Sequence, residues 1–259
     1  MIEQIEQRIE ISQSFYEKDE EVHPHSCIWG DFNMSLDGIL EYEVNGRKLW
    51  SPPSYGIWIP PRVAHHSIAV DQHTTHYAVI RLDPELCENF SVKPEMLSVS
   101  VFFRQLILEA FHVQQQGHLH YFRHLLQVIL DQLSSAPKHH HYLPQTHHPA
   151  LKPILEDLAA PALFQKSLRQ VLEPFAISER QLHRISQAEL QLSLSEWRSR
   201  AKLLYAIMQL RQGKSIKALS FELGYQHSSN FIEFFKRYTG QTPAQFKSCA
   251  APKPIQKLP

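Results

Sequence analysis

The sequence has little cysteine, no net charge and no long apolar run. Its 259 residues contain three cysteines, Cys27, Cys87 and Cys249, which are odd in number and far apart, so no disulfide framework is readable and a reducing compartment is favoured. The N-terminus is acidic and polar, unlike a secretory signal. No apolar run approaches the roughly 20 residues that span a bilayer. We therefore expect a cytoplasmic protein without a membrane partner, and 43% hydrophobic residues are enough for a folded core.

The net charge of zero is the sum of an acidic first part of the chain and a basic second part. Residues 1–150 carry 10 Lys/Arg and 18 Asp/Glu, whereas residues 151–259 carry 16 and 8, so a net −8 cancels a net +8. Such asymmetry is typical of a nucleic-acid-binding part joined to another domain. An ordinary two-domain protein with differently charged surfaces explains the same numbers, so charge alone does not decide.

The acidic half has the pattern of short β-strands. From about residue 22 to 83, apolar and polar residues alternate, as in Leu40-Glu-Tyr-Glu-Val44, which runs into Asn45-Gly46. Asn-Gly between alternating runs predicts a hairpin with a type I′ turn. Many short strands separated by prolines indicate an antiparallel sandwich or barrel.

The segment 96–135 has helical periodicity instead. Apolar residues recur three and four positions apart, and Gly117 interrupts them, which predicts two amphipathic helices. One face of these helices would cover the sheet. Another face would pack within the chain or against a second copy, so a homodimer is one expectation.

Three histidines in the strand region are candidates for a site. His23-x-His25 and, 40 residues later, Pro60-x-x-x-x-His65 resemble the sugar-binding type of cupin. Residues i and i+2 of a strand share a face, so His23, His25 and His65 together are candidate ligands of a divalent metal. Enzymatic cupins place a Glu shortly after His-x-His, and here only Asp31 or Cys27 can substitute. The alternatives are a polar effector pocket of these three histidines with Trp29, or hydrogen-bonded barrel histidines, and no cofactor is required.

The basic half repeats one helical plan. Stretches beginning at Ser167 and Ser215 start 48 residues apart, and each reads as a helix, a tight turn at a small residue, a capping Ser and a second helix. This pattern predicts two helix-turn-helix units. A helix over 195–210, capped by Ser195, would join them, with Arg198, Arg200 and Lys202 free to face solvent or phosphate.

The region from about 150 to 248 resembles the DNA-binding domain of the AraC family of bacterial transcriptional regulators. The matching residues follow the family's order and spacing: Trp197-Arg198, Leu203-x-x-Ala206, Gly213-x-Ser215-Ile216, Leu223-Gly224-Tyr225, Phe231-x-x-x-Phe235-Lys236-Arg237-Tyr238-Thr239-Gly240 and Thr242-Pro243. The resemblance implies a regulator of transcription that binds double-stranded DNA, with an effector-sensing cupin ahead of it. An activator of this kind would also contact RNA polymerase.

Polar residues on the outward faces of the two second helices are the candidate DNA contacts. In the first unit they are Arg180, Gln181, His183 and Arg184, and in the second Ser228, Ser229, Asn230, Glu233, Lys236 and Arg237. Side chains near a helix start reach base edges, whereas Lys236 and Arg237 near the helix end suit phosphate. The first unit departs from the family at Leu172, Pro174, Ala176, Ser186 and Gln191, so we expect specificity to depend more on the second unit.

These observations predict an α+β chain with a cupin-like antiparallel β-barrel, covering helices and an all-α tandem helix-turn-helix domain. The expected boundaries are 1–95 for the sensing domain, 96–135 for the helices, 136–150 for a His- and Pro-rich linker, 151–248 for the DNA-binding domain and 249–259 for a tail. The leading interpretation is a non-enzymatic, sequence-specific regulator that responds to a small molecule or metal. A cupin metalloenzyme with a helical appendage, and a binding protein whose helices only mediate assembly, are the alternatives.

Overall fold

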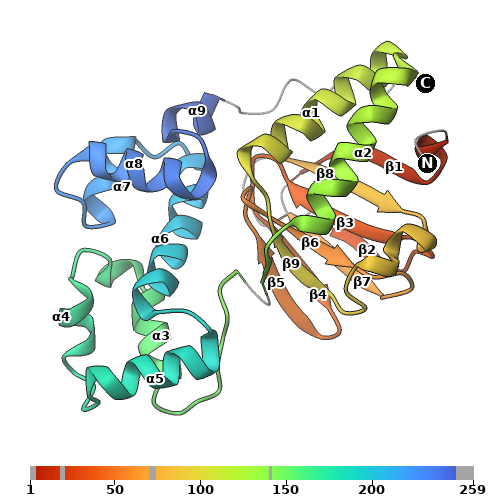
Figure 1. Ribbon diagram of the computed structural model, residues 1–259. Coiled ribbons are helices and arrows are strands. Elements are labelled where there is room, and N and C mark those ends of the chain that lie inside the picture. Colours follow the sequence, from red (N-terminus) through yellow and green to blue (C-terminus); the bar gives the residue numbers. More distant parts are fainter. Residues whose placement is uncertain (1–3, 18–20, 70–73, 140–141, 249–259) are drawn as a thin grey trace. The chain divides into compact units, whose positions relative to one another are not determined.

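The computed structural model describes residues 4–17, 21–69, 74–139 and 142–248 (Figure 1). The chain divides into a first compact unit that runs to Tyr142 and a second unit that spans residues 143–247. The first unit is built on β-sheets and the second is helical, which confirms the predicted α+β class.

Two antiparallel sheets form the first unit. The strands are β1 (Ile9–Tyr16), β2 (Glu21–His25), β3 (Gly30–Ser35), β4 (Leu40–Val44), β5 (Arg47–Ser51), β6 (Tyr55–Ile59), β7 (His65–Ala69), β8 (Thr75–Leu82), β9 (Glu95–Ser98) and β10 (Lys138–His139). The six-stranded sheet has the order β1-β8-β3-β6-β9-β10, and the four-stranded sheet has the order β2-β7-β4-β5. The predicted hairpin is β4–β5, in which Asn45 and Gly46 both have positive φ, at 53° and 71°. A type I′ turn requires this conformation at both positions.

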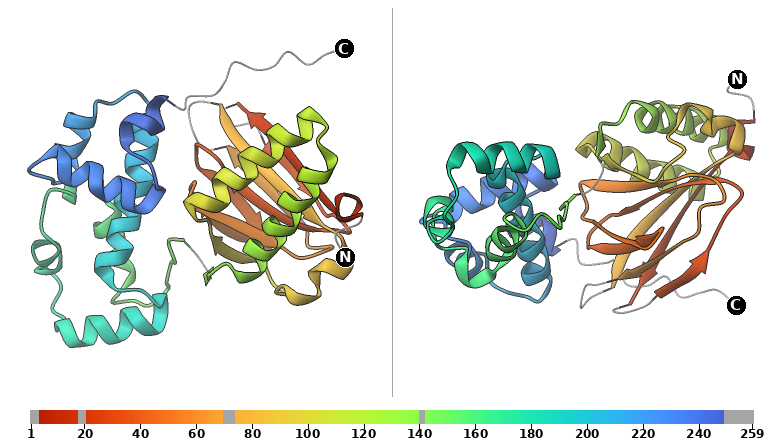
Figure 2. Two further views of the ribbon diagram at one scale, coloured as in Figure 1. Left: turned by 45° about the horizontal axis from the view of Figure 1, so that its top comes forward. Right: turned by 90° about the horizontal axis from the view of Figure 1, so that it is seen from below.

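Two helices cover the outer face of the six-stranded sheet (Figure 2). These are α1 (Val101–Gln116) and α2 (Leu119–Ser135), separated by Gly117 in the left-handed conformation, as predicted. Their apolar faces pack on strand residues such as Phe32 and Ile80 to form the main core of this unit. Trp58 belongs to the same core, on the helix side of the sheet, so it does not line the space between the sheets.

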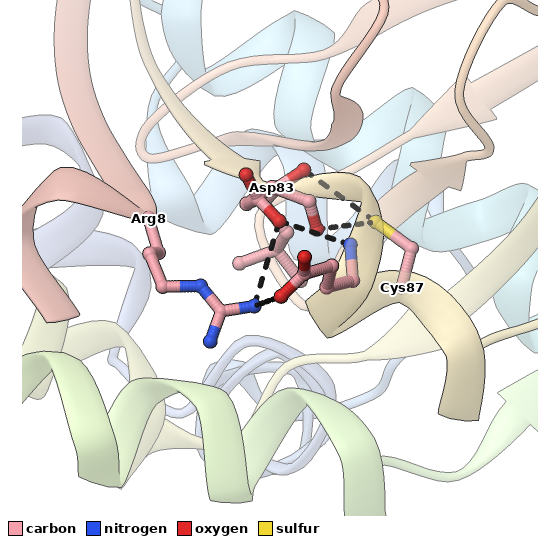
Figure 3. A network of polar contacts seen from close by, with 5 residues as sticks. Arg8, Asp83 and Cys87 are labelled. Atoms are coloured by element: carbon pink, nitrogen blue, oxygen red, sulfur yellow. Dashed lines mark hydrogen bonds and ion pairs between the residues drawn. The ribbon is translucent and has the colours of Figure 1, made fainter. Parts of the chain in front are cut away.

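The chain start is tied to the end of β8 by a polar network (Figure 3). Arg8, after the short helix η1 (Ile5–Gln7), pairs with Asp83, the N-cap of the short helix η2 (Pro84–Asn89), and with Glu85 in the first turn of η2, at 3.5 and 2.8 Å. In the same turn the Cys87 thiol donates to the carbonyl of Asp83, and burial raises its pKa to about 11. A thiol with so high a pKa stays protonated at neutral pH.

The segment predicted as a linker, 136–150, is not a continuous exposed connector. Lys138–His139 pair with β9 as β10, and Tyr142 is buried with its ring 4.8 Å from that of Tyr55. In the second unit, the carbonyl of Pro144 accepts a hydrogen bond from the Trp197 indole at 2.8 Å. His140 and His141 lie outside the described residues. Prolines exclude helix here, but they leave strand pairing and packing open.

Seven α-helices are described in the chain after residue 143. They are α3 (Lys152–Ala159), α4 (Leu168–Leu172), α5 (Glu179–Leu190), α6 (Leu194–Arg211), α7 (Ile216–Glu222), α8 (Ser228–Thr239) and α9 (Pro243–Ser248), with the short helix η3 (Pro161–Leu163) after α3. Helices α4–α5 and α7–α8 are the two predicted helix-turn-helix units, and α6 joins them (Figure 1). The cap of α6 is Ser193, whose hydroxyl accepts from the Glu196 amide, so the prediction of Ser195 was wrong by two residues.

Candidate DNA-binding surface and effector site

Helix α8 exposes a polar face opposite an aromatic core. Phe231 and Phe235 are fully buried with their rings 5.9 Å apart, because positions i and i+4 lie on one side of a helix. The side chains predicted to contact DNA are on the other side: Ser229, Asn230, Glu233, Lys236 and Arg237 are exposed, and Ser228 at the helix start is half-buried. Four of them line a surface hollow of about 690 Å³, together with Ser199, Tyr225 and Phe234.

Helix α5 exposes its predicted contacts in the same way. Arg180, His183 and Arg184 are exposed, while Leu182 on the opposite side is buried. Gln181 is exposed too, but its amide oxygen accepts from the backbone N–H and the hydroxyl of Ser178 at 3.3 and 2.9 Å. This capping box holds the start of α5, so Gln181 has its amide nitrogen left for a base edge.

A hollow lies between the two helices of the first helix-turn-helix unit and the start of α6. This hollow of about 430 Å³ is lined by Leu168, Leu172, Leu182, Ser186 and Leu194, among others. The departures Leu172 and Ser186 thus lie on one hollow, where a small Ser stands in place of the family's core Phe. Gln191, where the family has Gly, ends α5 in the left-handed conformation with φ 54°, which costs free energy for a residue with a Cβ.

Within the helical unit, the two helix-turn-helix units are connected by what we call the carbonyl joint, which consists of Arg198, Lys202, Phe164, Leu223 and Gly224. Arg198 Nη2 donates to the carbonyls of Leu163 and Lys166 at 2.8 and 2.7 Å. Lys202 Nζ donates to the carbonyl of Phe164, just before α4, and to the carbonyl of Leu223, in the turn between α7 and α8, at 2.9 and 2.6 Å. The prediction that Arg198, Arg200 and Lys202 face solvent or phosphate was therefore wrong. Arg198 and Arg200 are 7% and 6% exposed, and Arg200 pairs with Glu196.

Gly224 completes the carbonyl joint. It has φ +86°, and a Cβ on it would lie 2.7 Å from the carbonyl oxygen of Phe164. The turn between α7 and α8 therefore needs glycine both for its backbone conformation and for close packing.

Burial also affects the charge of the carbonyl joint, because it lowers the pKa of Lys202 to about 8.

Buried polar side chains lie between the two sheets of the first unit. The hydroxyl of Tyr77 donates to Asn33 Oδ1 at 2.6 Å, and Tyr42 from the facing sheet interacts electrostatically with Tyr77. Burial raises the pKa of Tyr42 far above its usual value, which keeps its hydroxyl neutral. Within the described protein, Asn33 Nδ2 and the Tyr42 hydroxyl are buried without a hydrogen-bond partner. Such groups are rare in folded proteins because each costs about 1–3 kcal/mol.

The structure brings together two of the three predicted histidines, His25 and His65, and leaves His23 apart. His25 and His65 face each other across β2 and β7 with ring centroids 4.4 Å apart, and they gather with Asp31 of β3. Burial lowers the pKa of His65 and raises that of Asp31, although the Arg81 guanidinium 3.1 Å from Asp31 opposes the latter shift. His23 is exposed and lies outside this group.

A register shift between Val22 and His25 explains the position of His23. It breaks the alternation from which a shared face was predicted. Trp29 lies half-buried in the bend before β3, where its backbone N–H donates to Cys27 Sγ at 3.4 Å. The sequence indicated Asp31 only as a substitute ligand. It did not indicate Asn33, because no local pattern distinguishes an amide side chain that will be buried.

Known proteins resemble both parts of the chain. A family described as "Helix-turn-helix domain" matches residues 172–248. The HTH-type transcriptional regulator NimR of Escherichia coli (strain K12) is 30% identical over 235 residues, which cover 87% of this chain and 81% of NimR. Among solved structures, ToxT from Vibrio cholerae O395 is 9% identical with a TM-score of 0.39 and covers 95% of this chain and 99% of its own. A cupin superfamily protein from Desulfitobacterium hafniense is 17% identical with a TM-score of 0.28 over 29% of this chain and 68% of its own.

The match to NimR extends through most of both proteins, so it includes the sheet unit as well as the helical one. No described helix is long and apolar enough to cross a membrane. The tandem helix-turn-helix units and the 30% identity to NimR over 87% of this chain show that it belongs to the AraC family of bacterial transcriptional regulators.

Proposed function

We propose that this regulator changes its affinity for DNA when a neutral, polar organic molecule binds between the two sheets. The observation that carries this proposal is the pair of unsatisfied groups on Asn33 and Tyr42. A ligand that offers an acceptor to the Asn33 amide and a partner to the Tyr42 hydroxyl recovers the free energy that these groups cost in the protein alone. Regulation then requires that the ligand bind one conformation or assembly state better than another.

On the DNA side, α5 and α8 are the two recognition helices. We propose that they enter successive major grooves, where Arg180, His183, Asn230 and Glu233 reach base edges. Lys236 and Arg237, together with Arg184, bind phosphate oxygens. The amide nitrogen of Gln181 and the hydroxyls of Ser228 and Ser229 complete the set. We propose no catalytic role, and the protein acts in the cytoplasm because the DNA is there.

A homodimer is the proposed assembly. Of the eight large apolar side chains that the described chain exposes, five lie on α1 and α2: Val101, Phe102, Leu119, Tyr121 and Val128. This share suits a surface that a second copy covers. Light scattering would show a dimer that Phe102→Ser plus Val128→Ser converts to monomer. A monomeric wild-type protein at micromolar concentration rejects the dimer. Contact with RNA polymerase follows if the protein is an activator.

DNA binding is tested by fluorescence anisotropy of labelled fragments as salt is varied. Lys236→Ala plus Arg237→Ala removes two phosphate contacts, so the slope of log K against log salt becomes shallower by about 2. Lys152→Ala, an exposed lysine of α3, is the control and leaves the slope unchanged. A slope that is equal in both variants would reject the assigned surface.

The effector site is tested separately by thermal shift against a library of neutral metabolites. A ligand that stabilises the wild type must lose this effect in Asn33→Leu and must alter the affinity for DNA. A ligand that stabilises both proteins equally binds elsewhere and contradicts the proposed site.

A further inference from the structure

Three ligand groups from three strands converge at one place between the sheets. His25 of β2, Asp31 of β3 and His65 of β7 each offer one atom, and these atoms lie within 4.8 Å of one another. Among the described residues, Asp31 and His65 are 3% and 5% exposed, while His25 is nearer to solvent. An ion at this position would contact two buried ligands, Asp31 and His65, and could enter from the solvent side at His25.

Both imidazole rings are oriented in the same way. Nδ1 of His25 donates to the carbonyl of His23 at 3.0 Å, and Nδ1 of His65 donates to the carbonyl of Val63 at 3.1 Å. A carbonyl can only accept, so each Nδ1 carries its proton and each neutral ring keeps the lone pair on Nε2. Histidines that bind metals in proteins have this second hydrogen bond, which fixes the tautomer and the ring.

Asp31 is held by an ion pair through one of its oxygens. The Arg81 guanidinium donates to Oδ1 at 3.1 Å, and we take Oδ2 as the ligand atom. Two neutral imidazoles and one carboxylate suit first-row transition ions, whereas Mg²⁺ and Ca²⁺ prefer oxygen ligands alone.

We infer that His25, Asp31 and His65 bind a divalent transition ion of the Zn²⁺ or Co²⁺ type. Ligand atoms around one such ion lie roughly 3–4 Å apart, so the three side chains draw together by about 1 Å on binding. Three protein ligands leave coordination positions for water or for an oxygen of the effector. The inference deepens the proposed effector site and rests on the proposed function only for its regulatory use.

The chain contains a second pair of histidines that serves as an internal control. His120 and His124 lie one turn apart on α2 with ring centroids 4.7 Å apart, and both are exposed. Such a pair binds transition ions weakly, so Co²⁺ binding by itself does not identify the site.

The experiment is Co²⁺ titration of the full-length protein, with equilibrium dialysis and visible absorption as readouts. Wild type, His23→Gln and the double variant His120→Gln plus His124→Gln are expected to bind one tight equivalent with the same d–d spectrum. His65→Gln and, independently, His25→Gln are expected to weaken that equivalent at least about tenfold and to change the spectrum. His25→Gln alters the more exposed ligand, so it gives a folded variant if His65→Gln destabilises the unit.

Tight binding that persists in both His65→Gln and His25→Gln would overturn the inference, as would its loss in the double variant. A wild type that binds no tight equivalent also overturns it. Anisotropy of the same samples on DNA keeps the two proposals apart. Retained, effector-dependent DNA binding without a Co²⁺ site rejects the metal alone, and a Co²⁺ site without effector-dependent DNA binding rejects the regulatory proposal alone.

Discussion

Nζ of Lys202, in the middle of α6, lies 2.6 Å from the carbonyl oxygen of Leu223, in the turn of the second helix-turn-helix unit. The same nitrogen lies 2.9 Å from the carbonyl of Phe164, ahead of the first unit. One side chain therefore connects the segment before α4 with the turn that leads into α8. We expect the carbonyl joint to hold α5 and α8 at a set distance, and so to limit the spacing of DNA half-sites that both can reach.

Lys202→Met removes both hydrogen bonds but keeps most of the length of the side chain. We expect the free energy of unfolding of the helical unit to fall by about 1–3 kcal/mol, because two buried carbonyls lose a donor. Affinity for DNA falls as well, more for sites that engage both units than for non-specific DNA. Urea denaturation and anisotropy measure the two effects. Lys152→Met is the matched control, and an equal loss in both variants would contradict the role of the joint.

The pKa of Lys202 gives stability a pH dependence of definite sign. Burial lowers this pKa from 10.5 to about 8, so between these values the unfolded chain holds a proton that the folded chain has released. The contribution of Lys202 to stability therefore rises with pH through this window and is lost as pH falls through about 8. The neutral amine keeps two N–H donors for its two carbonyls.

The measurement is urea denaturation of wild type and Lys202→Met from pH 7.5 to 10. The difference in free energy of unfolding between them should grow with pH. Lys152→Met, whose lysine is exposed, should show no such trend. A constant or shrinking difference would show that the lysine stays charged in the folded state.

Gly224→Ala tests the close approach at the carbonyl joint. The alanine must adopt positive φ and place its Cβ 2.7 Å from the Phe164 carbonyl oxygen, so we expect a loss of about 2 kcal/mol or more. Gly213→Ala is the control, because Gly213 has φ +85° and a Cβ on it would have no atom within 4 Å. It should cost only the backbone term of about 1 kcal/mol. If thermal denaturation shows equal losses of stability in the two variants, the close contact with the Phe164 carbonyl does not contribute to stability.

Tyr42→Phe tests the unsatisfied groups between the sheets. Removing a buried hydroxyl that has no partner should leave stability unchanged or raise it by about 1 kcal/mol, whereas most core changes destabilise. Tyr77→Phe deletes a hydroxyl of the same kind that donates to Asn33 at 2.6 Å, and it should cost about 1–2 kcal/mol. If the two variants lose equal stability, Tyr42 has a partner in solution and the argument for a ligand there fails.

The features that sequence predicted correctly are local ones. Asn45-Gly46 specifies its own turn, and Gly117 ends a helix whose apolar period is visible in the sequence. The tandem helix-turn-helix units follow from one pattern used twice. In each case a few residues close together in the sequence determine the local structure.

The features that sequence missed depend on partners far along the chain. Arg198 and Lys202 read as exposed cations because their carbonyl acceptors lie 21–38 residues away. His23 lies outside the histidine cluster because the register of β2 shifts between Val22 and His25. A His-x-His motif gives no sign of such a shift. Asn33 became part of the candidate site only when β4 brought Tyr42 and β8 brought Tyr77 into the same inter-sheet space.

Sequence-specific recognition by α5 and α8 is tested by selecting bound fragments from genomic DNA with the purified full-length protein at moderate salt. We expect an enriched motif with two elements about one helical turn apart, roughly 10 base pairs, because two joined recognition helices enter successive major grooves. It also predicts that Asn230→Ala weakens the preference within one element and leaves the other unchanged. Recovery of fragments without any shared sequence would contradict a sequence-specific regulator.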